Sequence, residues 1–339
     1  MKLNSRKINR QWVAIAAACM ISMVSTRETY AVDGAAQPFK LWVAGQNHTV
    51  HVGAQVKIER FTPEMARQIS AAGLDFVRFG VWTNAMQTPA YRRQVEKSFD
   101  AARDAKLPVI VTVRDTAPLI RVDTSDPGAQ DEQLRAAAAR LSATIVELSR
   151  NYGSEILAIE LWNEPEFEKY WPTGHAEKTF PVYMRAVCAG LQQIRGTTSI
   201  IGFAFATMPL PGSLPDQLLL GAGVPSNGCI DAVSWHAYGK SAEEIAHVAD
   251  QVRARFDLPT VITEWGVSSG RLGTESGQAA AVAAFLRERN TMHTPLISIY
   301  EWQNTTNAES SKERNFGLVN ADGARKPALD ALRSTLKGR

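Results

Sequence analysis

Two glutamates stand where this sequence most favours chemistry. Glu164 follows the apolar run 156–162 and Glu264 follows the run 260–263, so each lies where a short buried strand would end. Two carboxyl groups about 5–5.5 Å apart can cleave a glycosidic bond with retention, because one attacks the anomeric carbon while the other protonates the leaving oxygen. The sequence therefore offers Glu264 as a candidate nucleophile and Glu164 as a candidate general acid/base.

Other polar and aromatic side chains lie at or near the ends of runs of the same kind. Arg78, near the end of the run 76–82, could keep a neighbouring carboxylate ionised. His236 and Tyr238 are two residues apart, so both point to the same side of an extended segment, and the phenol could donate a hydrogen bond to Glu264. Trp302 ends its run and offers a flat apolar face for a sugar ring. Each alone would more commonly be structural, but their shared placement at strand ends favours a catalytic carbohydrate site.

Eight short runs, most of them rich in valine, isoleucine or phenylalanine, predict strands buried on both faces. These runs are residues 41–44, 76–82, 109–113, 156–162, 200–206, 232–236, 260–263 and 297–302. Helical patterns alternate with them, as at 131–150 and 279–289, and Thr62, Pro63 and Gly73 predict a capped helix. The alternation predicts an α/β fold with a single (β/α)8 barrel, and a doubly wound open sheet is the alternative. In a barrel the ends of the strands converge, which would bring the candidate residues together.

The first thirty residues differ in character from the rest. Basic residues at positions 2, 6, 7 and 10 precede an apolar run over 12–24, and Thr29 and Ala31 are small residues at the two positions that a signal peptidase reads. This pattern predicts a signal peptide over 1–31, a single domain over 32–339, and a periplasmic or secreted protein. A retained N-terminal anchor and a lipid-modified Cys19 are the alternatives.

The composition is that of an ordinary globular protein, with 339 residues, 45% hydrophobic and 21% charged. The net charge of +3 and the scattered lysines and arginines give no reason to expect a nucleic-acid partner. The six histidines show no compact ligand spacing, so we expect no metal and no cofactor. We expect a monomer with a carbohydrate substrate. Cys188 and Cys229 could form a disulfide in an oxidising compartment, but the sequence leaves their pairing open.

Several further side chains have two interpretations. Tyr170 and Trp171 follow the fourth predicted strand, where they could stack on sugar faces or form a small cluster over the barrel rim. Trp82 and Asn84 are similar candidates on weaker grounds. Glu160 falls earlier in its strand, so we expect it deeper in the barrel, in a structural ion pair.

Five motifs, in this order, resemble those of clan A of the glycoside hydrolases. They are GLDFVRF at 73–79, WNEP at 162–165, HAY at 236–238, TEWG at 263–266 and EW at 301–302. The resemblance covers nearly all of the expected domain and is closest to cellulase-like family 5 and the related family 39 of retaining β-glycosidases. It departs at the third strand, where family 5 enzymes usually have a histidine and this chain has Val113-Arg114-Asp115. Family 39 therefore fits at least as well.

The resemblance implies that Glu164 is the acid/base, that Glu264 is the nucleophile, and that Asn163 binds the 2-hydroxyl of the sugar. The residues that it implies around the nucleophile and substrate are Arg78, His236, Tyr238 and, as the floor of the subsite, Trp302. The expected function is retaining cleavage of a β-linked poly- or oligosaccharide, such as a bacterial exopolysaccharide. A barrel that binds glycan without cleaving it and a transglycosylase are the alternatives.

Overall fold

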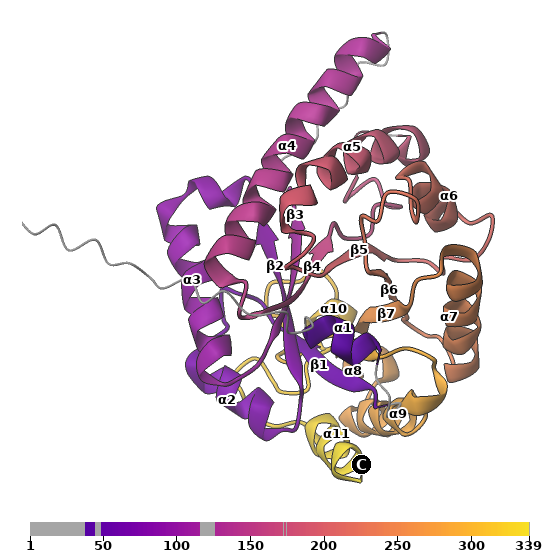
Figure 1. Cartoon of the computed structure of the whole chain (residues 1–339). Coiled ribbons are helices and arrows are strands. Elements are labelled where there is room, and N and C mark those ends of the chain that lie inside the picture. The colour runs from indigo at the N-terminus through magenta and orange to yellow at the C-terminus, as the bar shows by residue number, and fades with distance from the viewer. Residues whose placement is uncertain (1–37, 45–48, 116–125, 172, 174, 339) are drawn as a thin grey trace, which may run out of the picture. The chain divides into compact units, whose positions relative to one another are not determined.

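The computed structural model describes residues 38–44, 49–115, 126–171, 173 and 175–338, and the expected signal peptide lies outside them. Eight parallel strands pair in sequence order, and β8 pairs with β1 to close a barrel (Figure 1). The strands are β1 (His51–Gln55), β2 (Phe76–Trp82), β3 (Val109–Arg114), β4 (Ile156–Leu161), β5 (Ile200–Phe205), β6 (Ala232–His236), β7 (Thr260–Trp265) and β8 (Leu296–Ile299).

Helices surround this barrel and alternate with the strands, so the predicted single (β/α)8 barrel is confirmed (Figure 1). The α-helices are α1 (Pro38–Val43), α2 (Pro63–Ala71), α3 (Pro89–Asp104), α4 (Pro127–Tyr152), α5 (Ala176–Gly190), α6 (Leu214–Gly221), α7 (Ala242–Phe256), α8 (Ser269–Leu272), α9 (Glu275–Arg287), α10 (Ser311–Arg314) and α11 (Pro327–Lys337). Short 3-10 helices are η1 (Ala85–Gln87), η2 (Gln192–Ile194) and η3 (Arg289–Thr291).

The predicted strand over 41–44 is wrong. Those residues belong to α1 and the turn that follows it, and the first strand is β1. β1 contains Gly53 and Ala54, residues of low strand propensity, so the sequence pattern does not predict it. Glycine is required at position 53, since a Cβ atom there would lie 2.5 Å from the ring of Phe76.

The other strands lie where the sequence predicts them, with small shifts at their ends. β2 and β6 span the predicted residues. β7 continues to Trp265, so that Glu264 is inside the strand, whereas β8 stops at Ile299. The capped helix is confirmed as α2, because the Thr62 side chain accepts a hydrogen bond from the amide of Met65.

Cys188 in α5 and Cys229 before β6 form a disulfide, which resolves the pairing that the sequence left open. In the described part of the chain, no helix combines the length and apolar character needed to cross a bilayer.

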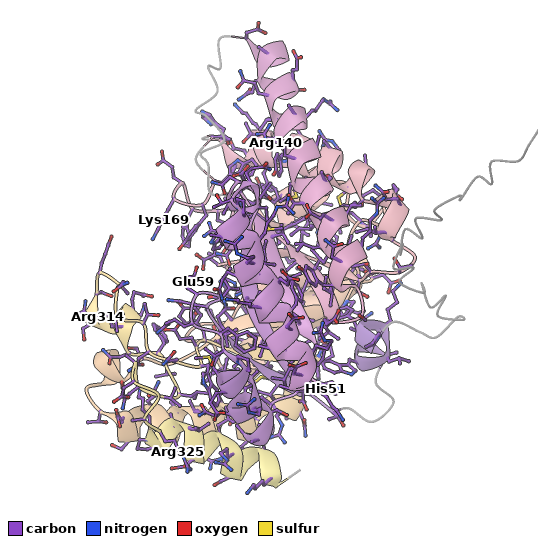
Figure 2. All side chains as sticks on the ribbon, turned by 90° about the vertical axis from the view of Figure 1, so that its left-hand side faces the viewer. His51, Glu59, Arg140, Lys169, Arg314 and Arg325 are labelled. Atoms are coloured by element: carbon purple, nitrogen blue, oxygen red, sulfur yellow. A yellow bond between two sulfur atoms is a disulfide. The ribbon has the colours of Figure 1, made fainter. Side chains whose placement is uncertain are left out.

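The two ends of the barrel are distinguished in the side view of Figure 2. Glu59, Lys169 and Arg314 follow β1, β4 and β8, respectively, and lie toward its left-hand side. His51, the first residue of β1, lies toward the right, near α1. The C-terminal ends of the strands, with the loops that follow them, therefore form one face, and that face carries the site described next.

Candidate active site

A cavity of about 850 Å³ opens among the loops at the C-terminal ends of the strands. This volume is in the range of binding sites for small molecules or for part of a larger chain. Five of the predicted site residues line it, and they come from β2, the β4 and β6 ends, and β7: Arg78, Asn163, Glu164, Tyr238 and Glu264. The structure thus brings together residues up to 186 positions apart in the sequence.

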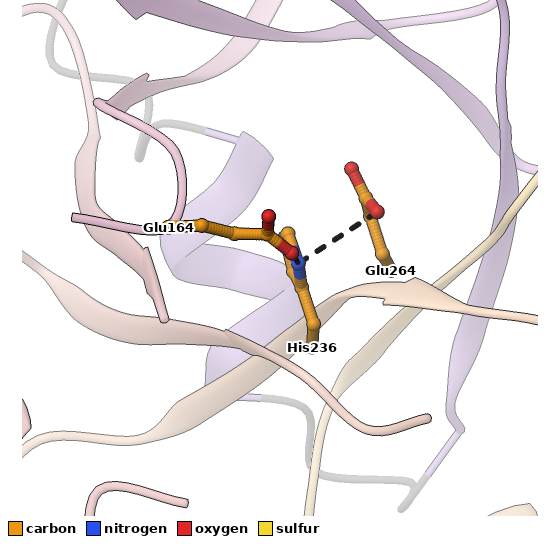
Figure 3. Close-up of side chains that lie close together, drawn as sticks. All are labelled: Glu164, His236 and Glu264. Atoms are coloured by element: carbon orange, nitrogen blue, oxygen red, sulfur yellow. Dashed lines mark hydrogen bonds and ion pairs between the residues drawn. The ribbon is translucent and has the colours of Figure 1, made fainter. Parts of the chain in front are cut away.

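The two glutamates face each other beside a histidine (Figure 3). One side-chain ligand atom from each of Glu164, His236 and Glu264 lies within 4.8 Å of the other two. His236 is buried, and its Nδ1 lies 2.8 Å from Oε1 of Glu164 and 3.7 Å from Oε2 of Glu264. The separation of the carboxyl groups is compatible with one acting directly on a sugar while the other exchanges a proton.

Glu264 is held in its ionised form. Burial alone would raise its pKa, but His236, Arg78 and Tyr238 outweigh burial and lower it below the ordinary value. Nη1 of Arg78 donates to Oε1 of Glu264 at 2.6 Å, and the Tyr238 hydroxyl donates to Oε2 at 2.8 Å. An anionic carboxylate at neutral pH is the form that a nucleophile requires.

Arg78 bonds both to residues that line the cavity and to a residue in the interior of the barrel. Besides Glu264, its guanidinium donates to Glu160 at 2.8 Å, to Gln55 at 2.7 Å and to Asn163 at 3.2 Å. Burial disfavours the charge of Arg78, yet the negative charges of Glu160 and Glu264 raise its pKa above the usual value. Glu160 is fully buried, and its predicted structural ion pair is confirmed.

The backbone at the end of β4 aims Asn163 and Glu164 into the cavity. Trp162 and Glu164 both have positive φ, at 70° and 50°, a conformation that is costly for residues other than glycine. Neighbouring strands hold this turn, because the amide of Trp162 donates to Val113 and the amide of Glu164 donates to Ala204. The motif is therefore positioned by β3 and β5 as well as by its own strand.

Two aromatic predictions are corrected. Trp302 is 1% exposed and does not line the cavity, so it cannot form the floor of a subsite. Because β8 ends at Ile299, the aromatic side chain that reaches the cavity from this strand is Tyr300. Trp171 is also buried, packed edge-on against Trp162 and Tyr183, so it belongs to the loop cluster and offers no sugar-stacking face.

Three further side chains form one wall of the cavity, and the sequence marked them only weakly. Arg114 is the last residue of β3 and belongs to the segment that departs from the family 5 pattern. Its guanidinium carbon lies 4.4 Å from the ring centroid of Trp82 and 4.8 Å from that of Tyr170. All three line the cavity, whereas Asn84 does not. The signal available in the sequence was the position of Arg114 at a strand end, where the related enzymes usually carry another residue type.

Within the described residues, Glu164, His236 and Glu264 are also the side chains that could bind a cation together. Nδ1 of His236 and Oε1 of Glu164 already bond to each other, and the two carboxylate oxygens of Glu264 accept hydrogen bonds from Arg78 and Tyr238. The guanidinium of Arg78, 2.6 Å from Glu264, would also repel a metal ion placed there.

Comparison with known proteins agrees with this geometry. The sequence matches the family Cellulase (glycosyl hydrolase family 5) over residues 32–307. A search of curated proteins finds no match.

Solved structures share the fold at low sequence identity. A family 39 glycoside hydrolase from the gut symbiont Bacteroides cellulosilyticus WH2 has a TM-score of 0.65 at 19% identity, over 85% of this chain and 63% of that one. A GH39 β-xylosidase from Caulobacter crescentus has a TM-score of 0.61 at 17% identity, over 85% of this chain and 70% of that one. A GH5-4 broad-specificity endoglucanase from Clostridium longisporum has a TM-score of 0.63 at 15% identity, over 89% and 99%.

This chain thus spans under two thirds of the length of the Bacteroides protein and nearly all of the clostridial one. The match over residues 32–307, the closed barrel and the facing carboxyl groups lead to one conclusion: the chain belongs to the cellulase family, glycosyl hydrolase family 5, a family of retaining O-glycosyl hydrolases.

Proposed function

We propose that this chain hydrolyses β-glycosidic bonds of a poly- or oligosaccharide by double displacement, with Glu264 as nucleophile and Glu164 as general acid/base. The observation that carries the proposal is that one carboxylate oxygen of Glu164 lies within 4.8 Å of one carboxylate oxygen of Glu264 at the cavity. An inverting enzyme would need about 6.5–9.5 Å between them to leave room for a water molecule.

In the first step, an oxygen of Glu264 attacks the anomeric carbon while Glu164 gives its proton to the leaving oxygen. The bond to the leaving sugar breaks and a glycosyl ester forms on Glu264. Arg78 and Tyr238 favour the ionised nucleophile before attack. Glu164 must start protonated, and its hydrogen bond with His236 fixes the direction of its carboxyl group.

In the second step, Glu164 is a carboxylate and takes a proton from water as the water oxygen attacks the same carbon. The ester bond breaks, Glu264 regains its charge, and Glu164 is again protonated. Two successive inversions give retention of configuration. Asn163 accepts a hydrogen bond from Arg78 through its carbonyl oxygen, which leaves its NH2 group to donate to a sugar hydroxyl.

The proposed setting is periplasmic or secreted, with an exopolysaccharide as substrate. The basic start followed by the apolar run 12–24 supports export. Fractionation of a bacterium expressing the full chain, followed by N-terminal sequencing, tests this setting. A chain retained uncleaved in the cytoplasm would contradict it.

A trapping experiment tests the reaction itself. A panel of 2-deoxy-2-fluoro-β-glycosides carrying a good leaving group should inactivate the enzyme and leave a glycosyl adduct on Glu264, identified by peptide mass spectrometry. Glu264→Ala should lower kcat on an aryl β-glycoside by about 10⁴-fold or more while the protein stays folded. Glu243→Ala, which removes an exposed glutamate on α7, is the matched control and should retain full activity.

Two alternatives predict other results. A barrel that binds glycan without cleavage would bind oligosaccharides equally well in the wild type and in Glu264→Ala, and neither would release product over days. A transglycosylase would use the same carboxylates but release longer oligosaccharides, because a sugar hydroxyl takes the place of water. Full hydrolytic activity in Glu264→Ala would refute the proposal.

A further inference from the structure

Arg114 is a cation in the substrate cavity for which the structure provides no anionic partner. It forms no hydrogen bond or ion pair with the part of the chain that the structure describes, and its Nε is buried without an acceptor. Burial lowers the pKa of Arg114 below its usual value, although the guanidinium remains charged at neutral pH. A half-buried cation of this kind is costly unless something pairs with it.

The guanidinium of Arg114 lies over the rings of Trp82 and Tyr170. They lie 4.4 Å and 4.8 Å from its central carbon, and both also line the cavity. Stacking on aromatic faces leaves the N–H edge of the group free, and that planar edge matches a carboxylate with two parallel hydrogen bonds. The stacked rings thus present Arg114 as an oriented donor.

Arg114 also lies close to the proposed point of cleavage. Its side chain lines the same cavity as those of Glu164 and Glu264. The Glu264 carboxylate would repel an anionic sugar, but Arg78 already compensates it, and Glu164 carries its proton when the proposed reaction starts. Arg114 is therefore available to compensate a negative charge brought by the substrate.

The other cations in the cavity do not have these properties. Lys57 pairs with Glu301, and Lys169 is exposed. The lining contains five basic residues and five glutamates, so its overall charge does not select an anion. Selection of an acidic sugar therefore depends on the position of the Arg114 guanidinium.

We propose that Arg114 recognises the carboxylate of a uronic acid, so that the natural substrate is an acidic glycan with a uronosyl residue beside the cleaved bond. This inference rests on the proposed glycosidase function and narrows its substrate class. Arginine suits this role because it offers a permanent charge and a bidentate edge.

Matched neutral and acidic oligosaccharides test the proposal. The first pair is β-(1→4)-linked gluco-oligosaccharides and β-(1→4)-linked glucuronate oligosaccharides, and the second is the corresponding manno- and mannuronate pair. Wild type should show a kcat/KM for the acidic member of a cleaved pair that is about 10- to 100-fold higher. The inactive Glu264→Gln variant should bind the acidic member more tightly by a similar factor, measured by titration calorimetry.

Arg114→Gln separates recognition from a structural role. It should lower kcat/KM for the acidic member at least tenfold more than for the neutral member, and Arg114→Lys should retain part of the preference. Arg140→Gln, which removes an exposed arginine on α4, should leave the preference unchanged. Thermal unfolding of each variant checks that the barrel is intact.

The outcomes distinguish this inference from the proposed function. Cleavage that depends on Glu264 without preference for the acidic member would overturn the role of Arg114 and leave the glycosidase proposal standing. Equal losses on both members in Arg114→Gln would assign the arginine a structural role. If neither pair is cleaved, equal affinity of the Glu264→Gln variant for both members would refute the inference.

Discussion

At the N-terminal end of the barrel, Phe39 from α1 packs among the first residues of the strands, including Phe76 and Leu296. At the opposite end, Arg78 and Glu264 meet beneath an open cavity. Apolar burial at one end contributes to folding without constraining chemistry, whereas charged groups at the other end must be held in place against the cost of burying them. The same eight strands therefore contribute mainly to stability at one end of the barrel and to reactivity at the other.

The largest expected effect comes from breaking the charged end. Arg78→Met leaves Glu160 and Glu264 without their shared cation, so the free energy of unfolding should fall by about 3–5 kcal/mol. Activity should fall as well, because Glu264 loses the partner that favours its ionised form. Chemical denaturation and kinetics on an aryl glycoside measure the two effects.

A double variant shows whether the two losses at Arg78 share one origin. Arg78→Met combined with Glu160→Gln should regain part of the lost stability, because the deepest unpaired charge is gone, but should regain no activity. Recovery of activity in the double variant would contradict the role given to Arg78 beside Glu264.

Breaking the apolar end should affect stability alone. Phe39→Ala removes a buried ring, so the free energy of unfolding should fall by about 3–4 kcal/mol. At a temperature where the variant is folded, kcat and KM should stay within twofold of wild type. A large change in kcat would mean that the two ends are coupled. The claim that stability and reactivity depend on different ends of the barrel would then be wrong.

Tyr238→Phe sharpens the comparison within the charged end. Loss of the 2.8 Å hydrogen bond to Glu264 should reduce kcat/KM by roughly tenfold. The ionised form of Glu264 is then less favoured, so the acidic limb of the pH profile should move to higher pH. An unchanged acidic limb would show that Glu264 does not govern it.

The same substitution affects stability with a definite sign. Because the pKa of Glu264 lies below its ordinary value of 4.5, its carboxylate stabilises the fold above that pH, and this contribution is lost as the pH falls through the lowered pKa. Tyr238→Phe should therefore lose stability at a higher pH than wild type does. Denaturation midpoints measured between neutral and acidic pH test this expectation.

The smallest expected effect is that of a chelator. Although Glu164, His236 and Glu264 could together bind a cation, the proposed mechanism needs none. Dialysis against EDTA should leave kcat unchanged, because the Arg78 guanidinium 2.6 Å from Glu264 already compensates the carboxylate that a metal ion would bind. Loss of activity on chelation, restored by a metal, would require a different mechanism.

The sequence alone predicts the barrel and the positions of most residues that line the candidate site, because both follow from local patterns of residue types. The runs that became β2, β4, β6 and β7 are apolar and end in residues of marked chemistry, so strand ends and site residues could be predicted together.

The wrong predictions concern residues whose positions depend on three-dimensional packing, which the pattern of apolar residues does not determine. An apolar run does not show at which residue a strand ends, so the sequence predicts Trp302 at the cavity and misses Tyr300. A loop tryptophan can be buried or exposed, and Trp171 is buried among Trp162, Phe180 and Tyr183, where its indole N–H finds Thr179. β1 lacks a strand pattern because the ring of Phe76 occupies the space of a side chain at Gly53.

Placing one guanidinium between two carboxylates has a consequence for the proposed reaction cycle. When Glu264 carries the sugar as an ester, it no longer bears a charge, and Arg78 would face an uncompensated positive field if Glu264 were its sole partner. Glu160 lies on the other side of that guanidinium and never takes part in bond formation, so it neutralises Arg78 while the ester exists. Glu160, which does not line the cavity, would thereby keep the guanidinium of Arg78 paired through both steps of the proposed reaction.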